Sequence, residues 1–185
     1  MIMEIFEEKS NFKMIYDDNS GIIVRKIDDE NLNYSHFMKD VDFIVYVNNI
    51  IVFIEVKNYN KKYSSIQTEE EKEDFFSKFL YRKPDKGHSY TYDCIQKARD
   101  TFIREYSSNR LGLNIHYYVI VSMPNTVPNF VLRNMRKDLE RYLPIFSKVD
   151  ESLYTNQFIY TSDVLTEYSW NNYIKNILGI EVNFY

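Results

Sequence analysis

Two runs of β-branched and aromatic residues give this chain its clearest hydrophobic pattern. They cover residues 41–47 and 50–57 and are separated by Asn48-Asn49. Asparagine tolerates the positive φ that both central residues of a two-residue hairpin turn require. The pattern therefore predicts a β-hairpin with Asn48-Asn49 as its loop.

The register of this hairpin brings three charged residues to one face. With a two-residue loop, Asp42 lies opposite Glu55, and Lys57 shares the face of Glu55 because side chains alternate along a strand. The other positions on both faces are mostly apolar, as in central strands that are covered on both sides. Two adjacent carboxylates at a buried edge are costly unless a cation joins them, and a divalent metal is the simplest such cation. The alternative is an edge hairpin in which Asp42 and Lys57 are solvated and Glu55 makes only a weak surface ion pair with Lys57.

Periodic apolar residues and turn signals predict the remaining elements. The first 17 residues place apolar side chains at a helical spacing, and Asp17 to Gly21 has the composition of a turn. The predicted elements are a helix over 1–17, a strand over 22–27, the hairpin, a short helix over 68–80, a helix over 90–106, a strand over 116–122, a helix over 128–143, a strand over 157–161, and a last helix that Ser162 begins and Gly179 ends.

The order of these elements predicts one α/β domain. A chain of 185 residues with 44% apolar residues is long enough for a single core. We expect an αβββαβ core over 1–122, an insertion at about 60–88, and a C-terminal helix-strand-helix extension over 123–185.

One motif in the hairpin resembles that of a known family. Asp42, twelve intervening residues and then the triplet Glu55-Val56-Lys57 resemble the signature of the PD-(D/E)XK nuclease superfamily, which has the restriction-endonuclease-like fold. Val41 stands where the superfamily usually has proline, which leaves the ligand set intact. The resemblance covers roughly the first two thirds of the chain and implies a mixed central sheet flanked by helices.

The resemblance also implies a catalytic site and its cofactor. Asp42, Glu55 and the carbonyl of Val56 would hold Mg²⁺ or Mn²⁺ with water. Lys57 would orient the attacking water and help to deprotonate it. In the superfamily, the helix after this strand often carries a Gln, Lys or Arg that points at the site, and Gln96 fits that role here.

A third carboxylate often comes from the first helix of the superfamily. Glu8 lies nearest the flank of the apolar stripe and is the first choice, with Glu4 and Glu7 behind it. The alternative is that all three are solvated acids in the first turns of a helix, where the helix dipole favours them.

The charge distribution suggests where nucleic acid would bind. The formal net charge is −4, yet residues 57–110 hold 12 Lys/Arg against 9 Asp/Glu and are the most basic part of the chain. A local basic patch can bind phosphates even on an acidic protein. The candidate phosphate contacts in this segment are Lys61, Lys62, Arg82, Lys83 and Arg99.

Several other classes of protein lack support. Cys94 is the only cysteine, which argues against disulfides and cysteine-held clusters within this chain. No apolar run has the length of a membrane span, and acids occupy the N-terminus where a signal peptide would be basic and then apolar. We therefore expect an intracellular, cytoplasmic protein with no membrane partner.

The resemblance implies a metal-dependent deoxyribonuclease, and an endonuclease rather than an exonuclease. Its partner would be DNA, with RNA as an alternative substrate, and a homodimer is expected if both strands are cut. Two alternatives stay open. One is a non-catalytic nucleic-acid-binding or assembly protein that retains the fold, and the other is a structural subunit whose aromatic surface pairs with itself.

Overall fold

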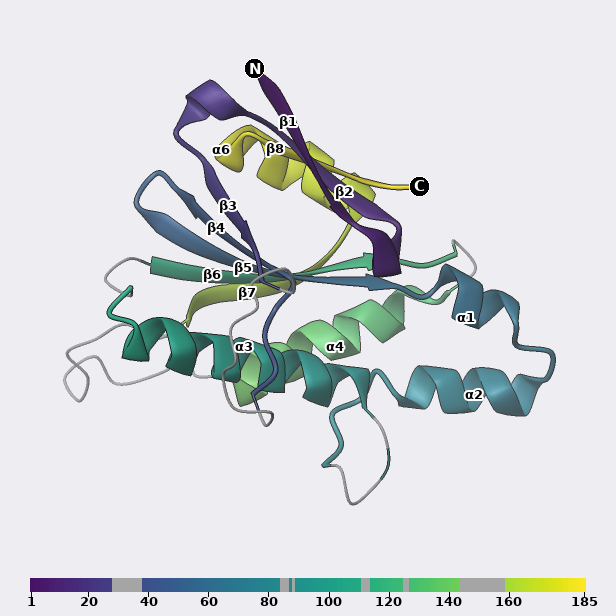
Figure 1. Cartoon of the computed structure of the whole chain (residues 1–185). Helices are drawn as coiled ribbons and strands as arrows, with labels where there is room; N and C mark the ends of the chain where they lie inside the picture. Colours follow the sequence, from purple (N-terminus) through teal and green to yellow (C-terminus); the bar gives the residue numbers. More distant parts are fainter. Residues whose placement is uncertain (28–37, 84–86, 88, 111–113, 125–126, 144–158) are drawn as a thin grey trace.

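The computed structural model describes the chain except residues 28–37, 84–86, 88, 111–113, 125–126 and 144–158. It is an α/β structure built on a mixed five-stranded sheet, with a smaller sheet of three strands packed across one face (Figure 1). The large sheet has the order β3 (Ile23–Lys26), β4 (Phe43–Val47), β5 (Ile50–Asn58), β6 (Asn114–Ser122), β7 (Ile159–Thr166), and the small sheet has the order β1 (Ile2–Glu7), β2 (Phe12–Asp17), β8 (Ile180–Phe184).

The hairpin of β4 and β5 has the predicted loop and register. Asn48 and Asn49 have φ values of 47° and 61°, which a two-residue turn of this kind requires. Val47 pairs with Ile50, and the antiparallel ladder continues to Phe43 opposite Ile54. Both strands are almost entirely buried, so the hairpin is central in the sheet, as its apolar faces predict.

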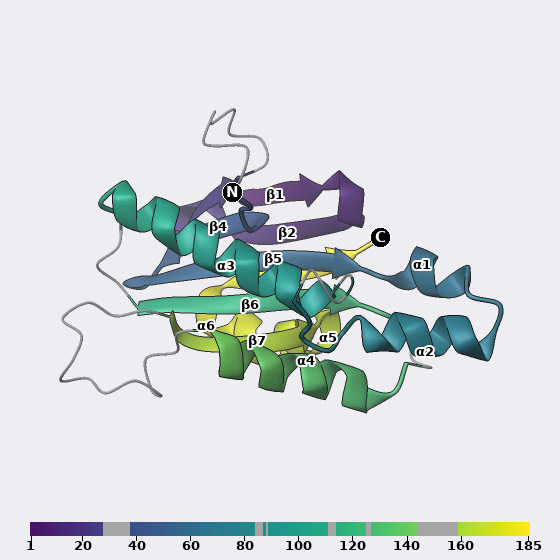
Figure 2. The same cartoon turned by 90° about the horizontal axis from the view of Figure 1, so that it is seen from below.

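Two parallel strands extend the sheet beyond β5. β6 runs parallel to β5, and β7 runs parallel to β6. Helices α3 (Tyr90–Ser107) and α4 (Asn129–Tyr142) lie along one face of the sheet (Figures 1 and 2). They bury apolar side chains against it, among them Cys94, Ala98 and Met135. Cys94 is therefore a core residue.

The predicted N-terminal helix is wrong, because residues 1–17 form a hairpin of β1 and β2. A short 3-10 turn (η1, Glu8–Ser10) joins the two strands, and Asn11 follows it in the left-handed conformation with φ 47°. Phe12, Met14 and Tyr16 alternate into the core, whereas Ile2 lies on the exposed face at 72% exposure. The sequence did not distinguish a strand from a helix here, because the same apolar positions fit both a period of two and a helical stripe.

The predicted last helix begins too early. Ser162 lies inside β7, and the helical segment is made of α5 (Glu167–Ser169), a π-helical turn η6 (Trp170–Ile174) and α6 (Lys175–Leu178). Gly179 ends it at φ 73°, as predicted. The chain then adds β8, which was not predicted and which pairs with β2.

The segment that follows β5 contains two short helices. These are α1 (Asn60–Ser64) and α2 (Glu69–Ser77), and Thr68 and Glu71 form a capping box at the start of α2. Phe75 and Phe79 of this segment pack against Tyr59 and Tyr90. This aromatic cluster attaches the segment to the end of the sheet. Within the described ranges, no helix is both long and apolar enough to cross a membrane.

Candidate active site

The hairpin places Asp42 and Glu55 beside each other under α3. Asp42 comes one residue before β4, and its Oδ2 accepts a hydrogen bond of 2.7 Å from the Val56 backbone N–H. The carboxylate of Asp42 thus reaches across to β5 at the position where the ladder of β4 ends. Glu55 has no exposed surface and Asp42 is 7% exposed, so both carboxylates have lost most of their hydration.

Two lysine ammonium groups join these carboxylates. Lys57 Nζ lies 2.5 Å from Glu55 Oε1. Lys97 Nζ, from α3, lies 3.2 Å from Asp42 Oδ1 and 2.9 Å from Glu55 Oε2. Lys97 therefore bridges the two acids, and the solvated edge hairpin is excluded as a description of this region.

Lys97, and not Gln96, is the α3 residue that reaches the acids. Gln96 is half-buried, and none of the contacts described for this part of the chain joins it to Asp42 or Glu55. Lys97 lies in line with the buried residues Cys94 and Thr101, at spacings of three and four along the helix. A lysine within an otherwise buried stripe was the signal in the sequence that could have identified it.

Burial and charge shift the pKa values of this group. Burial, followed by the nearby charge of Asp42, raises the pKa of Glu55 from 4.5 to about 7. For Lys57 and Lys97, burial alone lowers the pKa, but the Glu55 carboxylate outweighs it and the net shift is upward. Both amines therefore hold their protons at neutral pH, which disfavours Lys57 as the base that deprotonates water.

The geometry fits a cation shared by the two carboxylates. One ammonium group already contacts oxygens of both Asp42 and Glu55, so these oxygens surround a single cation position. Carboxylate oxygens are the ligands that Mg²⁺ and Mn²⁺ prefer. Among the described residues, no third Asp, Glu, His or Cys completes a cluster of metal-ligand side chains. A metal ion here would thus rely on the two carboxylates, backbone oxygen and water.

The N-terminal acids do not supply the third ligand. Glu8, the first choice from the sequence, is exposed in the η1 turn, because the helix that was to carry it is a hairpin. Glu4 pairs with Lys13 across that hairpin at 3.0 Å. Glu7 is the buried member of the three, at 4% exposure, and pairs with Lys26 at 3.5 Å.

The five predicted phosphate contacts lie on three different segments of the chain. Lys61 and Lys62 are exposed on α1, next to the end of β5. Arg99 donates a hydrogen bond of 2.6 Å to the carbonyl of Tyr142 and so links α3 to α4. Arg82 and Lys83 lie between α2 and α3, half-buried and exposed respectively.

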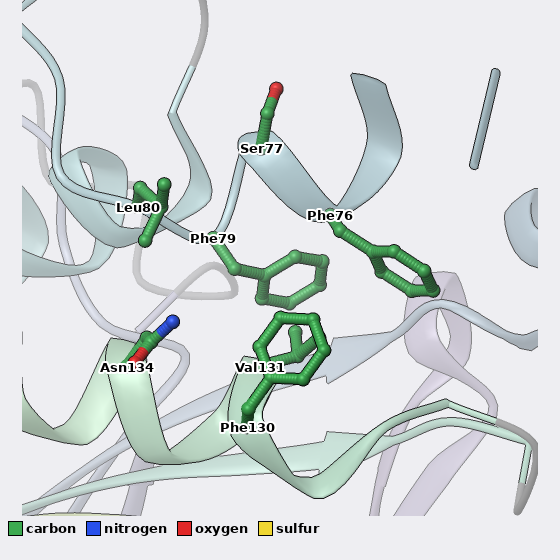
Figure 3. Close-up of a pocket in the computed structure, with 7 residues that line it drawn as sticks. All are labelled: Phe76, Ser77, Phe79, Leu80, Phe130, Val131 and Asn134. Atoms are coloured by element: carbon green, nitrogen blue, oxygen red, sulfur yellow. The ribbon is translucent and has the colours of Figure 1, made fainter. Parts of the chain in front are cut away.

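A separate apolar notch lies between α2 and α4 (Figure 3). Its volume is about 130 Å³, and the rings of Phe76, Phe79 and Phe130 surround it. Ser77 and Asn134 are its polar lining residues, and no ionisable side chain lines it. It therefore offers no group for acid–base or phosphate chemistry, and the Asp42–Glu55 pair is the better candidate.

Comparisons with known proteins leave the family open. No family model matches the sequence, and no significant match was found among curated proteins or solved structures. The function must therefore be inferred from the residues of this chain.

Proposed function

We propose that this protein is a metal-dependent nuclease that hydrolyses phosphodiester bonds of DNA. The observation that carries the proposal is the convergence of Asp42 and Glu55 on one cation position, with Lys57 beside them. The two acids adjoin each other in a buried position and the pKa of Glu55 is raised, a combination that is more frequent at functional sites than elsewhere.

The arrangement of the strands supports the proposed relationship to the PD-(D/E)XK superfamily. Three antiparallel strands, β3, β4 and β5, are followed by the short helices α1 and α2, by α3 and by the parallel strand β6. With α1 and α2 taken as the expected insertion, this order agrees with the βββαβ order that the motif implies. The chain departs from that core at its start, where β1 and β2 replace the first helix. This departure removes the element that would carry a third carboxylate.

In the proposed reaction, water attacks the phosphorus atom as the bond to the 3′ oxygen breaks, which leaves 5′-phosphate and 3′-hydroxyl ends. Asp42, Glu55 and the carbonyl of Val56 would hold Mg²⁺ or Mn²⁺, which supplies charge neutralisation and lowers the pKa of bound water. Lys57 stays protonated because of Glu55, so its role is to orient the water and to stabilise negative charge on the phosphate.

Lys97 occupies the position that the metal ion would need. Its ammonium group lies between the two carboxylates, so a cation that both carboxylates bind must take its place. The ammonium group of Lys97 would then be available to a phosphate oxygen of the substrate. Lys97 thus takes the place of Gln96 as the proposed α3 contribution to the site.

A cleavage assay tests the proposal. The purified protein is incubated with Mg²⁺ or Mn²⁺ and a panel of single-stranded, duplex, nicked, flap and four-way DNA, with RNA as a further arm. We expect cleavage that EDTA abolishes and that Asp42→Asn, Glu55→Gln and Lys57→Ala each remove. Cleavage that persists at the wild-type rate in Glu55→Gln would contradict the mechanism. Sedimentation of the same samples tests the expected homodimer.

A second candidate is a nucleic-acid-binding protein with no catalytic activity. The observation that favours it is the charge balance of the site, because two ammonium groups already neutralise the two carboxylates. This candidate predicts nucleic-acid binding without cleavage, and no heat when Mn²⁺ is titrated into the protein.

A further inference from the structure

A polar groove lies at the carboxyl end of β5, between α1 and the small sheet. Its volume is about 630 Å³. Figures 1 and 2 both place the β1–β2 connection and the C-terminal end of the chain beside α1. Three segments far apart in the sequence thus line one hollow, with Lys9 from η1, Lys61 and Lys62 from α1, and Tyr185 after β8.

The lining of this groove suits a polyanion. It consists of three lysines, three asparagines, one serine and one tyrosine, with no Asp or Glu side chain, although the chain as a whole has more acids than bases. Ammonium and amide groups donate hydrogen bonds to phosphate oxygens, and charged donors make the stronger bonds. The groove is therefore a local basic site on an acidic protein.

Hydrogen bonds fix the floor of the groove. Asn58 Nδ2 donates to the Ser10 carbonyl at 3.0 Å, which ties β5 to the η1 turn. Asn60 donates through its backbone N–H to Asn58 Oδ1 at 3.1 Å and through Nδ2 to Ser122 Oγ at 2.7 Å. The asparagines thus tie β5 to the η1 turn and α1 to β6. Lys61 and Lys62 are exposed, and the ammonium group of Lys62 lies 4.9 Å from the centroid of the Tyr90 ring.

Tyr185 gives the groove an aromatic surface. Its backbone N–H donates to the Asn11 carbonyl at 2.9 Å, and its ring meets the ring of Phe6 edge-on, with centroids 6.2 Å apart. The residue is nevertheless 62% exposed. A fixed, exposed ring next to lysines is the combination with which proteins stack the bases of single strands and hold their backbones.

The groove and the proposed active site lie at the same end of β5 but on opposite faces of the sheet. Asn58 directly follows Lys57, and the side chains of the two residues lie on opposite faces of β5. A nucleic-acid strand that contacts Lys57 would reach the groove by crossing the end of this strand, a step of about 3.3 Å per residue along the backbone. The groove is thus placed to hold nucleotides on one side of the cleaved bond.

We infer that this groove binds a single-stranded segment of the nucleic-acid substrate, with Lys9, Lys61 and Lys62 on phosphates and Tyr185 stacked on a base. Its volume falls in the range of small-ligand pockets, roughly 300–1,000 Å³, which suits a few nucleotides of one strand and not a duplex. The inference rests on the proposed function for its choice of polyanion and deepens it by specifying an unpaired segment.

Fluorescence anisotropy in EDTA tests this inference without cleavage. The probes are a labelled 15-nucleotide oligothymidine and the blunt duplex that the same strand forms with its complement. We expect tighter binding of the single strand. Lys61→Glu/Lys62→Glu should weaken it at least tenfold and reduce its dependence on salt. Tyr185→Ala should weaken it about 5- to 150-fold, the range that the loss of one stacked base predicts.

Lys13→Glu/Lys175→Glu is the matched control, because it changes the net charge equally at two lysines that do not line the groove. Circular dichroism checks that all variants are folded. Equal loss in the control and the groove variant, tighter binding of the duplex than of the single strand, or unchanged binding in Tyr185→Ala would overturn the inference. The binding assay needs no metal, so a negative result would contradict the groove inference without contradicting the proposed cleavage site. Binding in the groove without any cleavage activity would contradict the proposed nuclease function but not the groove inference.

Discussion

Helix α3 contributes to two clusters of charged side chains, and the two clusters differ in the kind of cation that surrounds the buried glutamate. Lys97, in its first half, joins Asp42 and Glu55. Glu105, two turns further and about 12 Å along the axis, also has a fully buried side chain, but arginines surround it. Its carboxylate accepts hydrogen bonds from Arg110 at 2.7 and 2.9 Å, and further bonds come from Arg25, Arg104 and the hydroxyl of Tyr46.

The two glutamates respond to burial in opposite ways. Burial alone raises the pKa of Glu105, but the hydrogen bonds from Arg110 and Tyr46 and the nearby guanidinium groups outweigh it, and the pKa is lowered. The pKa of Glu55 is raised to about 7, because burial and Asp42 outweigh the two lysines. The difference supports a structural role for Glu105, which ties β3 and β4 to α3, and agrees with the proposal that the site of Glu55 binds a divalent cation in place of Lys97.

Glu55→Gln should give the largest effect of any single change. It keeps the shape of the side chain but removes the charge that would hold the metal. We expect the cleavage rate to fall by about 10⁴-fold or more, as measured under single-turnover conditions with Mn²⁺.

Glu105→Gln is the matched control for this experiment, because it makes the same change in the other buried group. It should leave the cleavage rate within a few-fold of wild type at a temperature where it is folded. Equal losses of activity in the two folded variants would remove the distinction between the two groups.

For the free energy of unfolding we expect the opposite order, with a larger loss in Glu105→Gln than in Glu55→Gln. Glu105→Gln removes the charge that accepts hydrogen bonds from Arg25, Arg104 and Arg110, of which Arg104 is buried. Losing hydrogen bonds to a charged group costs about 1.5–3 kcal/mol in the free energy of unfolding. Urea unfolding at pH 7 measures the loss, and a loss below 1 kcal/mol would contradict the structural role.

The pH dependence of that loss has a defined sign. The folded pKa of Glu105 lies below its usual value of 4.5, so its contribution to stability is full above pH 4.5 and is lost as the pH falls through the folded pKa. The difference between wild type and Glu105→Gln should therefore shrink in acid. A difference that grows below pH 4.5 would rule out this assignment.

Lys97→Met tests whether the ammonium group of Lys97 competes with a metal ion for Asp42 and Glu55. The substitution keeps the length and apolar stem of the side chain but removes the competing cation. We expect Mn²⁺ to bind about tenfold more tightly, a change of about 1.4 kcal/mol, as measured by calorimetry. Gln96→Met, one residue earlier on α3, should leave the affinity unchanged. Equal affinities in Lys97→Met and wild type would show that the ammonium group and the ion do not compete.

Asn49→Gly should have the smallest effect. Asn49 has a φ of 61°, a conformation that glycine adopts without strain although it loses more entropy on folding. We expect a gain of about 0.5 kcal/mol in unfolding free energy and an unchanged cleavage rate, because the register and hence the pairing of Asp42 with Glu55 are kept. A loss of both stability and cleavage would indicate that the side chain of Asn49 has a role beyond the turn.

The hairpin could be predicted from the sequence because its evidence is local. Asn48-Asn49 specifies the turn, and strand alternation then brings Asp42, Glu55 and Lys57 together. The N-terminal segment could not be assigned in this way. Its apolar residues fit the period of a helix as well as that of a strand. The strand conformation is stabilised by β8, some 165 residues further along the chain, which pairs with β2.

The contribution of α3 to the site also depends on tertiary structure. Gln96 and Lys97 differ by 100° around the helix, and only the packing of Cys94 and Thr101 against the sheet decides which of them faces Glu55. Lys61 and Lys62 could be named as candidate phosphate contacts from the sequence, but the groove itself could not, because Lys9 and Tyr185 meet them only once the small sheet has formed.

Titration of Mn²⁺ into the chelator-treated protein tests the central claim most directly, because the claim is that the Asp42–Glu55 pair binds a divalent cation and the Glu105 group does not. The account predicts one calorimetric site per chain in wild type and in Glu105→Gln, and no binding in Glu55→Gln. A folded wild-type protein that gives no binding signal, or a signal that persists in Glu55→Gln, would contradict it.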